Sequence, residues 1–313
     1  LCLILSLCLL LAAFSGRIVG ILLLAVGAVS ASCGDRLKLH KADLSAASIT
    51  VSELIHLHGG TVHPKARQPK MDAKASDLQP IWALSVSDPK EWNRRVGILN
   101  SFESRSEDKE NIELRIRDLE DIPDFQQKEF VVRNLVDMLS QAGVVEDRSS
   151  FGYIRYRYND PLIHEGVKKA GNLLEMKTLL EARAVRDGDR SYFDAALMSV
   201  TIDWDGIVHE SRKKVAETRN EVDVVLTRGM TPLFISCKNG SVDENELYKL
   251  NTVAERFGSG YAKKMLIVSR LDMGNEIANE AFARRAEDMG VYLVENAADL
   301  SSKQWKQAME KVW

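Results

Sequence analysis

Residues 169–313 are predicted to form a mixed α/β domain in which a β-sheet is layered by helices. Segments with alternating apolar residues and segments with apolar residues at helical spacing follow in the order helix, three strands, helix, strand, helix, strand. The chain has 313 residues, of which 45% are hydrophobic and 28% charged. This size allows two compact domains, and this composition is that of a folded protein.

The first element of this domain is expected to be a helix, because Leu173, Leu174, Leu179 and Leu180 recur at helical spacing. The full set is a helix at 172–183, strands at 193–204, 221–226 and 233–237, a helix at 244–257, a strand at 264–269, a helix at 279–289 and a strand at 291–294. Strands and helices in such an order build a sheet with helices on its faces.

Residues 86–168 have the pattern of a small helical unit. Phe130, Leu135 and Leu139 belong to an apolar series at helical spacing, and Gly143 favours the end of that helix. The unit is therefore expected to contain a helix of ordinary length that ends before Gly143.

A strand is expected after this helix, at 151–160, with Phe151, Tyr153, Arg155 and Arg157 on one face. A basic and aromatic face can contact phosphates and stack on bases, which makes Arg155 and Arg157 candidate nucleic-acid contacts. A strand that packs two domains together gives the same pattern, so both interpretations stay open. A helix followed by such a strand resembles a winged helix.

Residues 1–34 are apolar, and Arg17 is the only charged residue before Asp35. They are long enough for one membrane helix and predict an N-terminal anchor. Two buried strands or a buried helix of a sheet domain would give the same pattern. Residues 35–85 are mixed, with an N-capped short helix expected at 49–60.

The net charge and the cysteine positions bear on which functions the chain can have. The net charge is -3, so contacts with nucleic acid must come from local patches or through a bound metal. Cys2, Cys8, Cys33 and Cys237 form no CxxC pair, which argues against a disulfide framework and a structural zinc site. A reducing, cytoplasmic setting suits the folded part.

The chemistry is expected on two neighbouring strands. Glu221 and Asp223 are two residues apart and share a strand face, and so do Ser236 and Lys238. The turn-rich segment 227–232 lets the strands pair as a hairpin, which brings Asp223 near Lys238. Buried charges of this kind need each other or a metal. Phosphodiester hydrolysis uses such a set: oxygen ligands for Mg²⁺ or Mn²⁺ and a cation beside the developing charge.

Three segments taken together resemble a known family. They are 171–175 (GNLLE), 220–226 (NEVDVVL) and 234–240 (FISCKNG). In this order they look like the nuclease motifs of CRISPR ancillary nucleases. Those proteins join a Rossmann-like CARF sensor domain, a winged-helix-like linker and a restriction-endonuclease-like PD-(D/E)xK domain. The resemblance covers about residues 125–313.

The resemblance implies a domain order and a site. Residues 35–85 would be a partial CARF-like segment, 86–168 the winged-helix-like linker and 169–313 the nuclease domain. By matching positions, Glu175, Asp223 and Lys238 would form the active site. The resemblance also implies cleavage of DNA or RNA with Mg²⁺ or Mn²⁺, a homodimer, and activation by cyclic oligoadenylate, although most of the sensor is missing or altered.

One position departs from the family pattern, because Ser236 stands two residues before the lysine, where an acid is usual. A hydroxyl is a poor metal ligand. We expect Glu221 to supply the oxygen, together with the backbone carbonyl of Cys237; the alternative is a site that binds metal weakly. The Cys237 side chain is expected to point into the core.

Two positions of the helix at 244–257, Tyr248 and Lys249, are further candidate nucleic-acid contacts. Three functions remain open: a metal-dependent nuclease, which we favour, a nuclease-like binding module without strong catalysis, and a membrane-tethered interaction protein. A simple buried ion pair is the alternative for Asp223 and Lys238.

Overall fold

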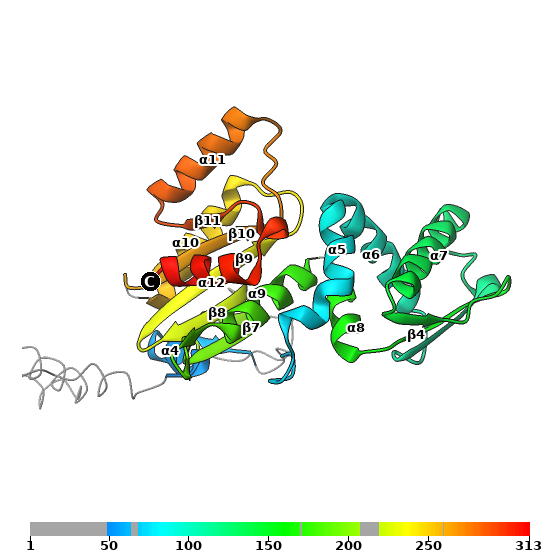
Figure 1. The fold of residues 1–313 in the computed structure, drawn as a ribbon, viewed down its shortest axis with the longest axis horizontal. Helices are drawn as coiled ribbons and strands as arrows, with labels where there is room; N and C mark the ends of the chain where they lie inside the picture. Colours follow the sequence, from blue (N-terminus) through cyan, green and yellow to red (C-terminus); the bar gives the residue numbers. More distant parts are fainter. Residues whose placement is uncertain (1–48, 64–67, 170, 207–218, 259) are drawn as a thin grey trace, which may run out of the picture. The chain divides into compact units, whose positions relative to one another are not determined.

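A six-stranded mixed sheet is the centre of the computed structural model, which describes residues 49–63, 68–169, 171–206, 219–258 and 260–313 (Figure 1). The strands lie in the order β1-β7-β8-β9-β10-β11; the pairs from β1 to β9 are antiparallel, and β9, β10 and β11 are parallel. The bounds are β1 (Thr61–Val62), β7 (Ala195–Asp203), β8 (Arg219–Arg228), β9 (Thr231–Lys238), β10 (Lys263–Val268) and β11 (Tyr292–Val294).

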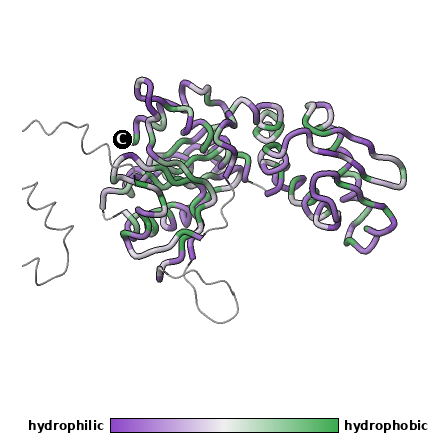
Figure 2. The backbone as a smooth tube through the Cα atoms, turned by 90° about the horizontal axis from the view of Figure 1, so that it is seen from below, coloured by the Kyte–Doolittle hydropathy of each residue, from purple (hydrophilic) through white to green (hydrophobic). Residues whose placement is uncertain are grey.

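Helices cover both faces of this sheet. They are α4 (Val51–Leu57), α9 (Asn172–Ala184), α10 (Glu244–Gly258), α11 (Glu276–Asp288) and α12 (Ser302–Lys311). One hydrophobic core contains residues of α9 and α12, and a second contains residues of α4, α10 and α11. Figure 2 shows hydrophobic stretches gathered along the sheet. The predicted mixed α/β class is confirmed.

Each element expected between 172 and 294 is present, with ends that differ by a few residues. The turn at 227–232 forms the predicted hairpin, in which Arg228 pairs with Thr231. Gly229 supplies a positive φ of 59° in this tight turn. A small hairpin of β5 (Arg186–Asp187) and β6 (Arg190–Ser191), a 3₁₀ turn η3 (Ala297–Asp299) and α12 were not expected.

Elements near the N-terminal end of the described residues join the same sheet. Thr50 and Glu53 form a capping box at the start of α4, as an N-capped helix requires. Val51 and Leu54 pack in the core with α10, and β1 pairs with β7. Part of the segment 35–85, for which a sensor origin was expected, therefore supports the sheet that carries the motif residues.

A three-stranded antiparallel sheet, in the order β2-β4-β3, lies within residues 86–168. Its strands are β2 (Asn111–Arg115), β3 (Val145–Asp147) and β4 (Tyr153–Tyr158). The remaining elements are α5 (Gln79–Ser87), α6 (Pro89–Glu103), α7 (Phe125–Gln141), α8 (Pro161–Val167), η1 (Ala75–Leu78) and η2 (Ile116–Asp118).

The helix predicted before Gly143 is α7, and its buried stripe is Val132, Leu135, Val136 and Leu139. Phe130 is 68% exposed. Its inclusion in the apolar series was wrong, because a residue five positions before Leu135 lies well away from that stripe on a helix.

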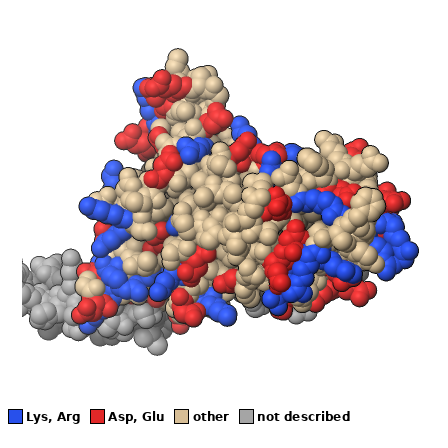
Figure 3. All heavy atoms as spheres, turned by 45° about the vertical axis from the view of Figure 1, so that its right-hand side comes forward, with Lys and Arg blue, Asp and Glu red and all other residues tan. Residues whose placement is uncertain are grey.

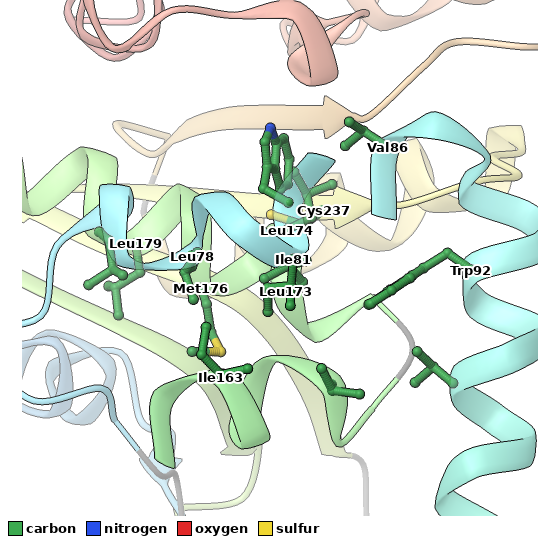
Figure 4. Packing of buried hydrophobic residues seen from close by; sticks show 14 of the residues in the cluster. Leu78, Ile81, Val86, Trp92, Ile163, Leu173, Leu174, Met176, Leu179 and Cys237 are labelled. Carbon is green, nitrogen blue, oxygen red and sulfur yellow. The ribbon is translucent and has the colours of Figure 1, made fainter. Parts of the chain in front are cut away.

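Helix α9 is buried on all sides from 172 to 182. Leu173, Met176 and Leu179 pack in one cluster with Ile81 of α5 and Ile163 of α8 (Figure 4). A charged side chain on such a helix needs an internal partner. Any acid on α9 is therefore either paired within the protein or part of a site.

Residues 1–34, for which an anchor was predicted, lie outside the described residues. Within the described ranges, no helix combines the length and the apolar character needed to cross a membrane. Ser48–Trp313 form one compact unit of the chain. The boundaries predicted at 86 and 169 stay predictions.

Candidate active site

Six charged side chains line one cavity of about 280 Å³ beside β8, β9 and α10. Three are acids and three are lysines, and they are Glu221, Asp223, Glu246, Lys169, Lys238 and Lys249. Ser236 also lines this cavity. The structure thus brings together both polar pairs predicted on the two strands.

Asp223 lies where β8 and β9 stop pairing. The antiparallel ladder ends with Val224 and Ile235. Beyond it, Asp223 Oδ2 accepts a hydrogen bond from the backbone N–H of Cys237 at 2.6 Å and one from the Ser236 hydroxyl at 3.2 Å. The carboxylate takes the place of a backbone carbonyl as the acceptor for the Cys237 N–H of β9. This bond holds Asp223 at the strand separation, the place where β8 and β9 stop pairing.

Glu175 reaches this region from α9 and is only 4% exposed. The Ser199 hydroxyl donates to Glu175 Oε2 at 3.2 Å. Burial, and then the charge of Asp223, raise the pKa of Glu175 from 4.5 to about 7, although Lys169 lowers it. Glu175 therefore changes its charge near neutral pH.

Asp223 has a raised pKa as well. Burial is the main cause, and the Cys237 N–H, Lys238 and Ser236 act in the opposite direction. Glu221 adds to the raised pKa through its negative charge. The acids from α9 and β8 thus repel one another in a poorly solvated place, which a cation would relieve.

The backbone of β7 is irregular opposite Asp223. Ser199 has a φ of +50°, in the left-handed region that few non-glycine residues adopt. Met198 packs in the core with α9, whereas Val200, two residues on, packs in the core with α10. The regular alternation of the strand is broken here, and the Ser199 hydroxyl contacts Glu175. Such backbone strain is common at functional sites.

Lys238 forms its ion pair with Glu246 on α10, with 2.8 Å between Nζ and Oε2. Burial acts to lower the pKa of Lys238, but the bond to Glu246 and the charge of Asp223 outweigh it, so the pKa is raised. Lys238 therefore stays protonated. Asp223 and Lys238 line the same cavity, and the charge of Asp223 acts on Lys238, while the direct ion-pair partner of the lysine is Glu246.

Lys169, just before α9, is the cation beside the acids of β8. Its Nζ lies 3.2 Å from Glu221 Oε1. The charges of Glu175, Glu221 and Asp223 all act to raise the pKa of Lys169, against a lowering by burial. The expected metal-ligating oxygen of Glu221 is thus engaged by an ammonium group.

Of the two nucleic-acid contacts predicted on α10, one lines the cavity and the other does not. Lys249 lines the cavity and lies 2.9 Å from Glu246. Tyr248 does not line it, and its hydroxyl accepts a hydrogen bond from Arg285 at 2.7 Å. The Cys237 side chain is buried and contacts Thr178, which agrees with a core position.

Arg155 and Arg157 lie on β4, in the three-stranded sheet, and are not brought to the cavity. Arg155 pairs with Glu113 at 2.7 Å, and Arg157 with Glu146 at 3.3 Å. On the face shown in Figure 3, basic and acidic side chains are interspersed. A nucleic-acid role for both arginines stays a prediction.

Three residues of the site were missed from the sequence: Lys169, Ser199 and Glu246. Each is an ordinary polar residue in its own segment, without a motif. Glu246 had one available signal, since it lies eight positions after Lys238 in the first turn of the next helix. Ser199 had none, because its irregular φ appears only in the folded strand.

Carboxylate oxygens are the kind of donor that a hard divalent cation takes. Mg²⁺ is commonly held by one or two carboxylates, with waters and substrate phosphates completing its shell. Glu175 and Asp223 supply two carboxylates that repel each other. Within the described residues, no group of three or more His, Cys, Asp and Glu side chains is placed to hold a metal. Waters, substrate oxygens or the Cys237 carbonyl would complete the shell.

Fold and site together define a mixed α/β protein with a cavity of acids and lysines at a point where two strands separate. No protein-family model and no curated protein sequence matches the chain. Among solved structures, protein VC1899 from Vibrio cholerae matches with a TM-score of 0.53 and 20% identity, over 84% of this chain.

A second structure is Can2 from Sulfobacillus thermosulfidooxidans in complex with cyclic tetra-adenylate, with a TM-score of 0.45 and 14% identity over 84% of this chain. The likeness to VC1899 shows a shared fold. This chain spans 60% of the length of each of the two neighbours.

Proposed function

We propose that the chain is a divalent-metal-dependent nuclease that hydrolyses phosphodiester bonds of DNA or RNA. The observation that carries the proposal is the arrangement at the strand separation. Asp223 is held there by the Cys237 N–H, Glu175 is buried nearby with a pKa of about 7, and Lys238 lines the same cavity.

Each side chain has a role in this proposal. Glu175 and Asp223 would hold Mg²⁺ or Mn²⁺, with the Cys237 carbonyl as a further ligand. When bound, such an ion supplies Lewis-acid polarisation of a phosphoryl oxygen and a more acidic water. Lys238, fixed by Glu246 at 2.8 Å, places a positive charge where negative charge develops on the phosphate.

Lys249, whose side chain is 64% exposed, would contact the nucleic-acid backbone from the lining of the cavity. The sequence resemblance to CRISPR ancillary nucleases supports the same reaction class and a role in antiviral defence. A homodimer and binding of cyclic oligoadenylate are further proposals that rest on this resemblance.

Cleavage of labelled single-stranded and duplex DNA and RNA by the full chain, with Mn²⁺ or Mg²⁺, tests the proposal. Asp223→Asn and Lys238→Ala are expected to lower cleavage by about a hundredfold or more, because each removes charge stabilisation of the transition state. Circular dichroism should show an unchanged fold.

Asp187→Asn and Lys263→Ala are matched controls, since both residues lie outside the cavity. They should cleave like the wild type. Unchanged cleavage by either Asp223→Asn or Lys238→Ala would contradict the assignment.

A nucleic-acid-binding module with weak catalysis is the second candidate, and Ser236 at the usual acidic position favours it. Ser236→Glu separates the two. In a nuclease this change should hold or raise cleavage up to severalfold, because it restores a carboxylate oxygen. A chain that binds nucleic acid but cleaves it neither before nor after this change would be a binding module.

A further inference from the structure

Lys169 occupies a place that the proposed reaction does not explain. It lies between α8 and α9, and its Nζ contacts Glu221 Oε1 at 3.2 Å. It lines the cavity together with Asp223. An ammonium therefore pairs with Glu221, two residues from Asp223, which is one of the two carboxylates to which the proposed function assigns a divalent cation.

The ion pairs around the cavity show which acids interact with Lys169. Lys238 and Lys249 both pair with Glu246, at 2.8 and 2.9 Å. The acids Glu175, Glu221 and Asp223 all act on Lys169. Among the three lysines lining this cavity, Lys169 is the one paired with an acid of β8.

We propose that Lys169 is a built-in counter-ion of the carboxylates at the strand separation, and that it competes with the divalent cation for them. The inference rests on the proposed function. It adds a regulatory property: the metal enters only when the ammonium leaves the acids.

The ion pair between Lys169 and Glu221 is exposed enough to break when a divalent cation binds. The side chains of Lys169 and Glu221 are 58% and 46% exposed. Exposed ion pairs of this kind contribute little to stability, so the long lysine side chain can leave Glu221 at little cost. A backbone phosphate of nucleic acid offers the ammonium a new partner, which would make metal and nucleic acid bind cooperatively.

Calorimetric titration of the full chain with Mn²⁺, without nucleic acid, tests the proposal. Lys169→Met keeps the apolar stem and removes the charge. It is expected to bind Mn²⁺ about fivefold more tightly than the wild type, because one nearby positive charge no longer repels the ion. Lys168→Met is the matched control, since Lys168 pairs with Glu165 at 3.6 Å and does not line this cavity.

Thermal unfolding gives a second readout. Without metal, Lys169→Met should melt at a lower temperature, because the acids lose their counter-ion, and Mn²⁺ should raise its melting temperature more than that of the wild type. Equal or weaker Mn²⁺ binding by Lys169→Met than by the wild type would overturn the proposal. Weaker cleavage with unchanged Mn²⁺ affinity would instead make Lys169 a substrate contact and would also overturn it.

The failure of the proposed function looks different. If the wild type, Lys169→Met and Lys168→Met all bind no Mn²⁺, the metal-dependent nuclease itself is contradicted, and the competition with it. Asp223→Asn in the same titration tests whether Mn²⁺ binds at this cavity. This variant should bind Mn²⁺ more weakly than the wild type, whereas Lys169→Met should bind it more tightly.

Discussion

Two regions of the molecule each bury a glutamate, Glu103 and Glu175, and the groups that surround these two side chains have opposite character. Glu103, beside the three-stranded sheet, is 6% exposed. Its Oε1 accepts hydrogen bonds from the hydroxyls of Tyr156 and Tyr158, at 2.5 and 2.8 Å, and His164 lies 3.5 Å from Oε2. The carboxylate is surrounded by donors, as a buried structural charge requires.

Glu175, at the strand separation, is 4% exposed and faces other acids. The Ser199 hydroxyl donates to it, and the charge of Asp223 raises its pKa. Burial depth is nearly the same in both regions, so burial alone does not mark a functional residue. The surroundings do: donors stabilise Glu103, whereas acids destabilise the charged form of Glu175.

The largest expected effect is on stability. Glu103→Gln should lower the free energy of unfolding by about 2–4 kcal/mol, because a neutral amide oxygen accepts the two tyrosine hydrogen bonds less strongly and an amide N–H₂ replaces the acceptor that faces His164. Glu175→Gln should leave it unchanged or raise it, because a charge that its neighbours repel is removed. Urea unfolding without divalent ions measures the free energy of unfolding of both variants. An equal loss of stability in the two would contradict the proposed difference between the surroundings of Glu103 and Glu175.

A smaller effect is expected from pH. The folded pKa of Glu175 is about 7, above its ordinary 4.5. Between these values the folded protein holds a proton that the unfolded chain has released. The contribution of Glu175 to stability is therefore fully present below pH 4.5 and is lost as the pH rises through about 7, a loss of about 3 kcal/mol.

Urea unfolding at pH 5 and pH 8 without divalent ions checks this. The difference in stability between the wild type and Glu175→Gln should shift in favour of the variant at pH 8. A difference that does not change with pH would mean that Glu175 is ionised throughout.

The strands and helices that carry the motif were predictable because local patterns specify them. Alternation predicted β8 and β9, and the short turn between them predicted their pairing, which placed Asp223, Ser236 and Lys238 around one cavity. Leucine spacing predicted α9 and so the element that carries Glu175. Such signals lie within a few residues of one another in the chain.

What was missed depends on contacts between distant segments. Glu246 meets Lys238, and Lys169 meets Glu221, only because helices pack beside the two strands. The irregular φ of Ser199 appears at a strand position that alternation treats as regular. Arg155 and Arg157 have a pattern that suits nucleic acid, yet neighbouring strands supply Glu113 and Glu146 as partners.

The most direct measurement is anomalous diffraction from a crystal of the full chain soaked in Mn²⁺. We expect an anomalous peak about 2.0–2.6 Å from carboxylate oxygens of both Glu175 and Asp223, with Lys169 turned away from Glu221. We expect no peak at Glu103, whose Oε1 accepts both tyrosine hydroxyls and whose Oε2 lies beside His164. The absence of a peak where β8 and β9 stop pairing at saturating Mn²⁺, or a peak that touches neither Glu175 nor Asp223, would contradict metal binding by these two acids.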